Sequence, residues 1–154
     1  MNIVLFQPEI PHNTGAIGRT CLITGSTLHL IHPLGFNLSE KSLKRSGLDY
    51  WQKIDVRHYL DYDDFVQQNF SLQTNYYFVE TGGKSTYAQV QYNTNDYLIF
   101  GSETRGLPHW ILDKNYDKII SIPMVDGERS LNLSVAAGIV LYEALRQNAF
   151  KGLS

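Results

Sequence analysis

The chain has 154 residues, with 13 lysines and arginines against 15 aspartates and glutamates, so its formal net charge is −2. This length predicts one domain over residues 1–154 with enough chain to bury a core. The slight negative charge argues against a general nucleic-acid coat protein but leaves room for a local basic patch. No apolar run reaches the roughly 18 residues of a membrane span, so none is expected.

A single cysteine, Cys21, excludes an internal disulfide and fits a reducing compartment, so we expect a cytoplasmic protein. One cysteine also leaves no zinc-binding spacing, and no metal is expected. The first residues, MNIVLF, lack a basic region and begin a strand at once, which does not match a signal peptide.

Apolar runs and the residues that interrupt them predict the elements in chain order. Strands are expected at 2–6, 27–31, 54–59, 76–80, 97–100 and 119–122. Helices are expected from a cap at Asn13 or Thr14 to Thr24, over 40–45 after Ser39, over 62–69 after Asp61, at a turn starting at Ser85, over 108–112, and after a junction at 130–134. A final helix runs to about Leu145.

The alternation of strands and helices predicts an α/β fold. The strands are apolar throughout, which indicates a mostly parallel sheet with helices on both faces. Ligands of such sheets bind at the carboxyl ends of the strands. Three strands end there in small, loop-forming residues, at 80–83, 101–103 and 123–125. These loops are the predicted walls of one pocket.

The final helix is apolar on two sides. At about 100° per residue, one face carries Leu133, Ala137, Val140, Leu141 and Ala144, and a nearly opposite face carries Val135, Ile139 and Tyr142. One face can pack on the sheet of the chain, and the other needs a further partner. A two-fold homodimer is the expected partner.

The polar pieces of the sequence are separated. There is no GxxxxGK[ST], GxGxxG or GxSxG motif. Each remaining piece has a plain structural interpretation when it stands alone: Asn13 and Ser130 as helix caps, and Gly101 and Gly106 as turn residues.

Together and in order, however, NTGxxGRT (13–20), FGSExxGL (100–107) and IPMxxxxxSLNLSVA (122–136) resemble the three motifs of the SpoU branch of the SPOUT methyltransferases. The stretches IVLFQPEIPHNTG and KRSGLDY (44–50) are similar to the small TrmL (YibK/CspR-like) group within it.

This resemblance implies an α/β fold with a deep C-terminal trefoil knot, a homodimer with catalytic groups supplied across the interface, and S-adenosyl-L-methionine as cofactor. The implied activity is methylation of the ribose 2′-hydroxyl of the tRNA wobble nucleotide, a cytidine or modified uridine at position 34. Generic topology rules would have argued against a knot.

The resemblance also implies a set of cofactor-binding residues after three strands: Val79, Glu80, Thr81, Gly82, Gly101, Ile122, Met124, Ser130 and Leu131. Apolar walls with nearby main chain suit an adenine ring, and Gly101 is expected to let the backbone approach the ligand. The loop 81–84 departs from relatives, which often place a lysine directly after the threonine.

Arg19, Ser130 and Asn132 match the implied catalytic residues. A guanidinium keeps its charge at working pH, so Arg19 is expected to stabilise a developing alkoxide or clamp a phosphate rather than act as a base. The plain alternative pairs Arg19 with Glu9 or Glu103. Glu103 either accepts backbone N–H bonds, the preferred interpretation with Thr104-Arg105 as partners, or receives a proton.

RNA contacts are expected at Asn13, Lys44, Arg45 and Tyr142, the last of which alternatively fills the dimer interface. Charge mixed with aromatic rings at Lys41, Tyr50, Trp51 and Lys53 suits phosphate contact and base stacking, while the alternative is a solvated helix with packed aromatics.

Three rival functions remain open from the sequence. The first is 2′-O-methylation at another tRNA or rRNA position, the second is a non-catalytic RNA-binding dimer, and the third is a generic nucleotide-binding module.

Overall fold

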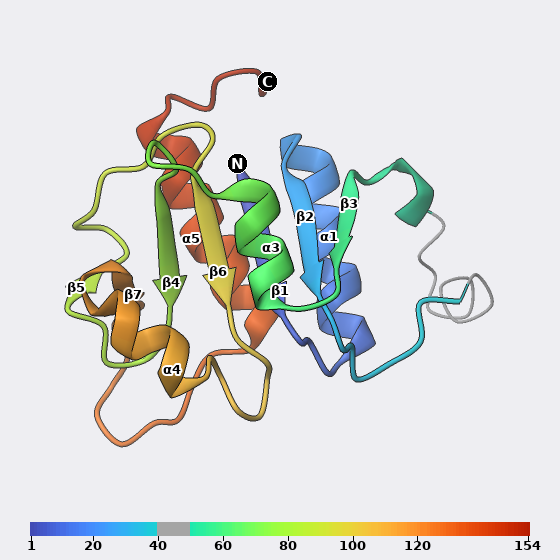
Figure 1. Cartoon of the computed structure of the whole chain (residues 1–154). Helices are drawn as coiled ribbons and strands as arrows, with labels where there is room; N and C mark the ends of the chain where they lie inside the picture. The colour runs from blue at the N-terminus through green and yellow to red at the C-terminus, as the bar shows by residue number, and fades with distance from the viewer. Residues whose placement is uncertain (40–49) are drawn as a thin grey trace.

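The computed structural model describes residues 1–39 and 50–154 (Figure 1). Its strands are β1 (Asn2–Phe6), β2 (Thr27–Ile31), β3 (Val56–Tyr59), β4 (Tyr76–Val79), β5 (Ser85–Thr86), β6 (Tyr97–Phe100) and β7 (Ile119–Ser121). Its helices are α1 (Pro11–Thr24), α3 (Tyr62–Asn69), α4 (His109–Leu112) and α5 (Leu133–Gln147), with 3-10 helices η1 (Trp51–Lys53) and η2 (Asp113–Lys118). The helix expected at 40–45 lies outside the described residues.

The strands form one sheet in the order β3-β2-β1-β6-β4-β7-β5, and every strand pairing in the described residues is parallel. The predicted α/β class and parallel sheet are therefore confirmed. Parallel pairing brings the carboxyl ends of β4, β6 and β7 to the same edge. The knot concerns how the chain threads through itself, and it stays a prediction.

Helices cover both faces of this sheet, as the uniformly apolar strands predicted. Alternate strand residues point to opposite sides: Ile3 and Leu5 of β1 belong to the core that packs against α1 and α5, while Val4 and Phe6 belong to the core that packs against α3 and α4. In Figure 1, α3 and α4 lie in front of the sheet and α1 and α5 behind it. Within the described part of the chain, no helix has the length and apolarity that a membrane crossing needs.

The first helix begins earlier than predicted. Pro11 occupies its first turn, and Ile10 precedes it in an extended conformation without a side-chain cap. A proline fits here because the first N–H groups of a helix have no partner within it. The expectation that Asn13 or Thr14 caps α1 was therefore wrong. The predicted end is confirmed, because Gly25 follows Thr24 in the left-handed conformation, with φ 64°.

The helical turn expected at Ser85 was also wrong, since Ser85 and Thr86 form β5 and pair in parallel with β7. The reason lies in Gly83. A Cβ at Gly83 would come within 2.7 Å of the backbone of Ile120, so the glycine lets the chain run directly against β7. Elsewhere the differences are small. Pro108 precedes α4 rather than lying inside it, and β3 begins at Val56, two residues later than expected, where its pairing with Leu28 of β2 begins.

The final helix has the two apolar sides that its sequence predicted. Ala137, Val140, Leu141 and Ala144 are buried against the chain's own core. On the other side, Val135 is 50% exposed and Tyr142 is 44% exposed. The described chain thus leaves one apolar face of α5 without a partner.

His29 of β2 is packed in the core. The side chain is fully buried and lies against the rings of Tyr59, Phe65 and Tyr97. Its Nε2 is 3.0 Å from Asn2 Oδ1 and its Nδ1 is 2.8 Å from the Tyr59 hydroxyl. Because Asn2 Oδ1 can only accept, Nε2 carries the proton of a neutral ring. Burial lowers the pKa of His29 from 6.5 to about 4.

This shift predicts a loss of stability in mild acid. Between pH 6.5 and 4 the unfolded chain binds a proton at His29 that the folded chain does not, so unfolding becomes easier as the pH falls, by up to about 3 kcal/mol. Urea unfolding of the wild type and of His29→Gln across this range measures the effect. The variant should lose clearly less stability than the wild type, and exposed His12→Gln should behave like the wild type. Parallel curves for the wild type and His29→Gln would contradict the assignment.

Candidate active site at the carboxyl edge of the sheet

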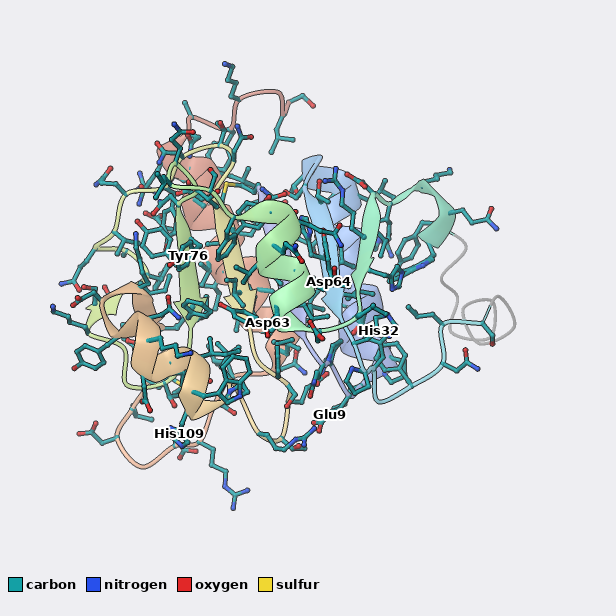
Figure 2. All side chains as sticks on the ribbon, in the orientation of Figure 1. Glu9, His32, Asp63, Asp64, Tyr76 and His109 are labelled. Atoms are coloured by element: carbon teal, nitrogen blue, oxygen red, sulfur yellow. The ribbon has the colours of Figure 1, made fainter. Side chains whose placement is uncertain are left out.

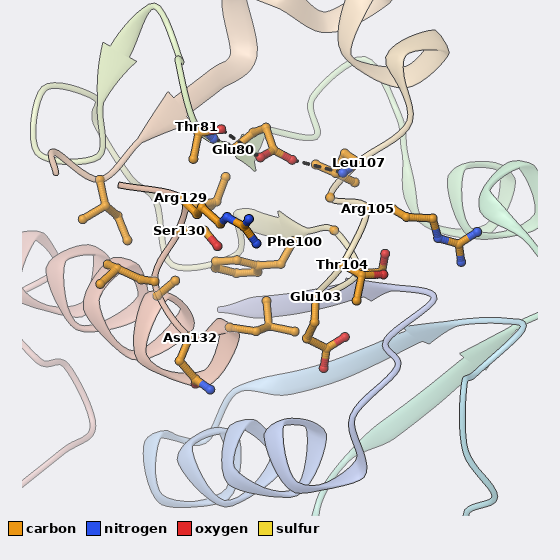
Figure 3. Close-up of a pocket in the computed structure, with 18 of the residues that line it drawn as sticks. Glu80, Thr81, Phe100, Glu103, Thr104, Arg105, Leu107, Arg129, Ser130 and Asn132 are labelled. Atoms are coloured by element: carbon orange, nitrogen blue, oxygen red, sulfur yellow. Dashed lines mark hydrogen bonds between the residues drawn. The ribbon is translucent and has the colours of Figure 1, made fainter. Parts of the chain in front are cut away.

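A cleft of about 650 Å³ opens where β4, β6 and β7 end (Figure 3). Its walls come from the ends of the three strands, the loop 101–107, the loop 122–132, and the first residues of α1, α4 and α5. The predicted meeting of three loops in one pocket is confirmed. Figure 2 shows Glu9 and His109 at this same edge of the molecule.

Most of the residues expected to bind a cofactor lie in this cleft: Val79, Glu80, Thr81, Gly101, Ile122, Met124, Ser130 and Leu131. Gly82 is not part of the lining. Its φ of 75° instead gives it a turn role that a left-handed backbone reserves for glycine. Asn13, expected to contact RNA, also lines the cleft.

Several lining residues were not singled out from the sequence. They are Ile10, Phe100, Ser102, Thr104, Arg105, Leu107, His109, Leu112, Arg129, Leu133 and Ala136, with Glu103 and Gly106 considered only for other roles. His109 and Leu112 enter because α4 starts directly after the loop 101–107. Their signal was the GLPH continuation of the second motif, which a proline-initiated helix places at the same sheet edge.

The loop 101–107 folds back on itself and is fixed by Glu80. Ser102 and Gly106 exchange backbone hydrogen bonds, and the Glu80 carboxylate accepts from the N–H groups of Thr81 and Leu107, each at 3.0 Å (Figure 3). Gly106 has φ 64°, and a Cβ there would be 2.6 Å from Glu80 Oε2. Glu80 therefore shapes the wall of the cleft through the backbone it holds.

Gly101 lines the cleft, and the fold of the loop gives a reason for glycine at this position in addition to the expected one. A Cβ at this position would overlap with the backbone of Gly106 and Leu107 in the same loop. The missing side chain thus makes room for the folded loop, and the expected close approach of a ligand stays a prediction.

Two carboxylates clasp this loop to the segment before α1. Glu103 accepts from the backbone N–H of Glu9 at 2.7 Å and of Ile10 at 3.1 Å. In the other direction, Glu9 accepts from the N–H and hydroxyl of Thr104, and Arg105 lies 3.6 Å from it. The hydrogen bonds from Thr104 lower the pKa of Glu9. Glu103 therefore accepts backbone N–H bonds and holds a loop, as the preferred interpretation predicted. Its partners are Glu9 and Ile10, however, and not Thr104-Arg105.

A chain of side-chain hydrogen bonds continues from Glu103 into the third motif. Asn13 donates to Glu103 at 3.1 Å and accepts from Asn132 Nδ2 at 3.0 Å. Asn132 Oδ1 in turn accepts from the N–H groups of Ser134 and Val135 and caps α5. The cap is therefore Asn132 and not Ser130, and Ser130 lies exposed in the cleft lining.

Arg19 and Tyr142 do not line the cleft of their own chain. Arg19 is exposed on α1, with its guanidinium carbon 5.7 Å from the centre of the Tyr50 ring. Among the described residues neither Glu9 nor Glu103 forms an ion pair with it, and Glu9 pairs with Arg105 instead. The predicted contacts of Lys44 and Arg45 lie outside the described residues.

Two other histidines, His12 and His32, do not line the cleft. His12 is exposed, and the His32 ring is hydrogen-bonded to His58 at 2.9 Å. In the part of the chain that the structure describes, no group of three or more histidine, cysteine, aspartate or glutamate side chains is placed to hold a metal ion.

Comparison with known proteins agrees with this geometry. Residues 1–142 match the model of the SpoU rRNA Methylase family, so the chain belongs to that family. It is 47% identical over 156 residues to a tRNA (cytidine(34)-2′-O)-methyltransferase of Yersinia pestis, covering 99% of this chain and 96% of the relative.

Two solved structures extend the comparison. One is described as giving insights into the 2-OH methylation of C/U34 on tRNA. It has a TM-score of 0.89 and 41% identity, and the match covers 96% of this chain and 95% of that protein's chain. The other is an AdoMet-bound rRNA methyltransferase of Sinorhizobium meliloti, with a TM-score of 0.80 and 26% identity over 94% of this chain and 55% of that protein.

The clasp predicts that Glu103 stabilises the fold. Glu103→Ala removes the acceptor of two backbone N–H groups and of the Asn13 amide, and should lower the free energy of unfolding by about 2 kcal/mol. Urea denaturation measures the change, with the exposed Glu128→Ala as the control. If the two variants unfold within about 0.5 kcal/mol of each other, Glu103 does not hold the loop.

Proposed function

We propose that this protein transfers a methyl group from S-adenosyl-L-methionine to the ribose 2′-hydroxyl of tRNA nucleotide 34. The observation that carries the proposal is the cleft itself, because it gathers residues from all three SpoU motifs at the carboxyl edge of the sheet. The tRNA methyltransferase of Yersinia pestis, nearly half identical over the whole length, supports the substrate.

The cleft fits the proposed cofactor. Its volume of about 650 Å³ is in the range of small-ligand sites. Ile122, Met124 and Leu131 supply apolar walls for a flat ring, and the loop 101–107, held by Glu80, presents backbone groups beside them. S-adenosyl-L-methionine, when bound, supplies a methyl group that its positive sulfur has already activated. The AdoMet-bound relative of Sinorhizobium meliloti supports this choice.

The residues of the chain then have to align the ribose and stabilise charge. Arg19 stabilises the developing alkoxide or clamps the neighbouring phosphate, because its fixed positive charge suits both tasks. Ser130 faces the cleft and orients a substrate or cofactor hydroxyl. Asn132 fixes the start of α5 and aligns Asn13. Glu103 already accepts three N–H groups, which favours a structural role over proton transfer.

A homodimer completes the site in this proposal. Asn13 lines the cleft, but Arg19 lies six residues further along α1, which is about 9 Å along the helix axis. Arg19 and the 61%-exposed Ile23 lie four residues apart on one side of α1, and the neighbouring α5 carries the exposed Val135 and Tyr142. A second copy packed on α1 and α5 covers these apolar residues and brings its Arg19 to this cleft. Tyr142 lies in this interface, and the trefoil knot belongs to the same proposal.

A tRNA substrate also implies a cytoplasmic location. The rival activity is ribose methylation at another tRNA or rRNA position. It has weaker support, because the rRNA methyltransferase relative is only 26% identical and is much longer than this chain.

The decisive experiment incubates the protein with total tRNA and cofactor labelled in the methyl group, then maps the labelled ribose. We expect the label at position 34. A label at another nucleotide, or on ribosomal RNA offered in parallel, would assign the rival activity. No transfer to either RNA, with RNA binding retained, would identify a binding protein without catalysis.

Arg19→Lys should lose at least about a hundredfold in kcat and keep its affinity for S-adenosyl-L-methionine. The lysine keeps the charge but lacks the two-pronged geometry of a guanidinium. Activity assays together with calorimetric titration of the cofactor measure both quantities. Full activity of Arg19→Lys would remove Arg19 from the reaction.

Hybrid dimers test whether Arg19 acts across the interface. Leu131→Asp disrupts an apolar wall of the cleft, so each variant alone is inactive. Co-expressed with Arg19→Lys, it forms mixed dimers in which one site combines an intact cleft with an intact Arg19. About a quarter of the wild-type activity should return for random pairing. No recovery in verified mixed dimers would place Arg19 at its own chain's cleft.

A further inference from the structure

Residues 50–54 dock on the outer part of α1, at the two glycines of the first motif. Tyr50 contacts the helix at Gly15 and Arg19, and Trp51 and Ile54 contact it at Gly18. The contact joins Tyr50, the last residue of the KRSGLDY stretch, to the NTGxxGRT motif. The function proposed above does not connect these two stretches.

Two contacts of Tyr50 with α1 lie one helical turn apart. Its hydroxyl donates to the carbonyl oxygen of Gly15 at 3.0 Å. Its ring face lies 5.7 Å from the guanidinium carbon of Arg19, within the usual range of a cation–π contact. Because residues four apart lie on one side of a helix, a single ring bound to the carbonyl of residue 15 is held beneath the side chain of residue 19.

Gly18 explains why the docking is so close. A Cβ at this position would lie 2.9 Å from Trp51 Cζ3 and 2.9 Å from Ile54 Cδ1. The Trp51 ring therefore packs directly on the helix backbone, where any side chain at position 18 would displace it. This packing fixes the segment from which Tyr50 reaches Arg19.

We propose that Tyr50 is a positioning residue that orients the Arg19 guanidinium toward the RNA substrate. The inference deepens the function proposed above and depends on the role of Arg19 in it. An exposed arginine has many rotamers, and a flat ring beneath the guanidinium selects those in which its N–H groups point outward along the plane. The pre-oriented guanidinium can then meet the ribose and phosphate oxygens without searching for its geometry.

The experiment compares two substitutions of Tyr50. Tyr50→Phe keeps the ring face and should retain kcat within about threefold. Tyr50→Leu removes the ring face and should lower kcat at least about tenfold. The affinity for S-adenosyl-L-methionine, the dimer mass and the circular dichroism spectrum should be unchanged in both. Tyr50→Met, which fills the same space without a ring, replaces Tyr50→Leu if the latter fails to fold.

A double-mutant cycle separates positioning from a general effect on structure. If Tyr50 acts through Arg19, adding Tyr50→Leu to Arg19→Lys should cause little further loss of kcat. Additive losses would overturn the inference. It would also be overturned if Tyr50→Leu alone is fully active while Arg19→Lys alone is inactive. A higher KM for tRNA with kcat unchanged would also overturn it, because Tyr50 would then bind the RNA itself. Full activity of Arg19→Lys would instead refute the proposed function.

Discussion

The site depends on one set of hydrogen bonds, those that the carboxylates of Glu9 and Glu103 make to each other's segments. Residues 9 and 103 are 94 apart in the sequence, and these bonds tie the segment before α1 to the loop 101–107. Charge-assisted bonds to backbone N–H groups are among the stronger hydrogen bonds in proteins. Through Asn13 and Asn132 the same set of bonds reaches the start of α5, so the three motif segments are held as one unit.

Helix α1 therefore serves the proposed site at two places along its length. Its first turns are tied into the cleft through Asn13, while the exposed stripe beyond them carries Arg19. In the proposed function the two residues need opposite surroundings, because Asn13 is buried among fixed partners, whereas Arg19 is exposed and would have to reach a substrate. A rigid helix connects them without a hinge, so any tilt of α1 moves both.

The sequence predicted the sheet, its parallel pairing and the common edge where the loops meet, because these follow from apolar runs and from turn residues that stand next to them. Through the resemblance to a family it also placed eight of the nine expected cofactor-binding residues in the cleft, but fewer than half of the residues that line the cleft were predicted. What local patterns could not give was the partner of each polar side chain. Asn13 looked like a cap because helix starts favour asparagine. Its partners are Glu103 and Asn132, 90 and 119 residues away. Ser85 looked like a helix start because serine often caps helices. Its actual pairing with β7 depends on the distant backbone of Ile120, which no local pattern reveals.

The close contact at Gly18 has a consequence for how such a chain can change over time. The indole of Trp51 and a side chain at position 18 compete for the same volume on the surface of α1. A related sequence that acquires a larger residue at 18 must give up the indole at 51 or lift the whole 50–54 segment from the helix. What position 18 can hold therefore depends on the residue at 51, although the two positions are 33 apart in the printed sequence.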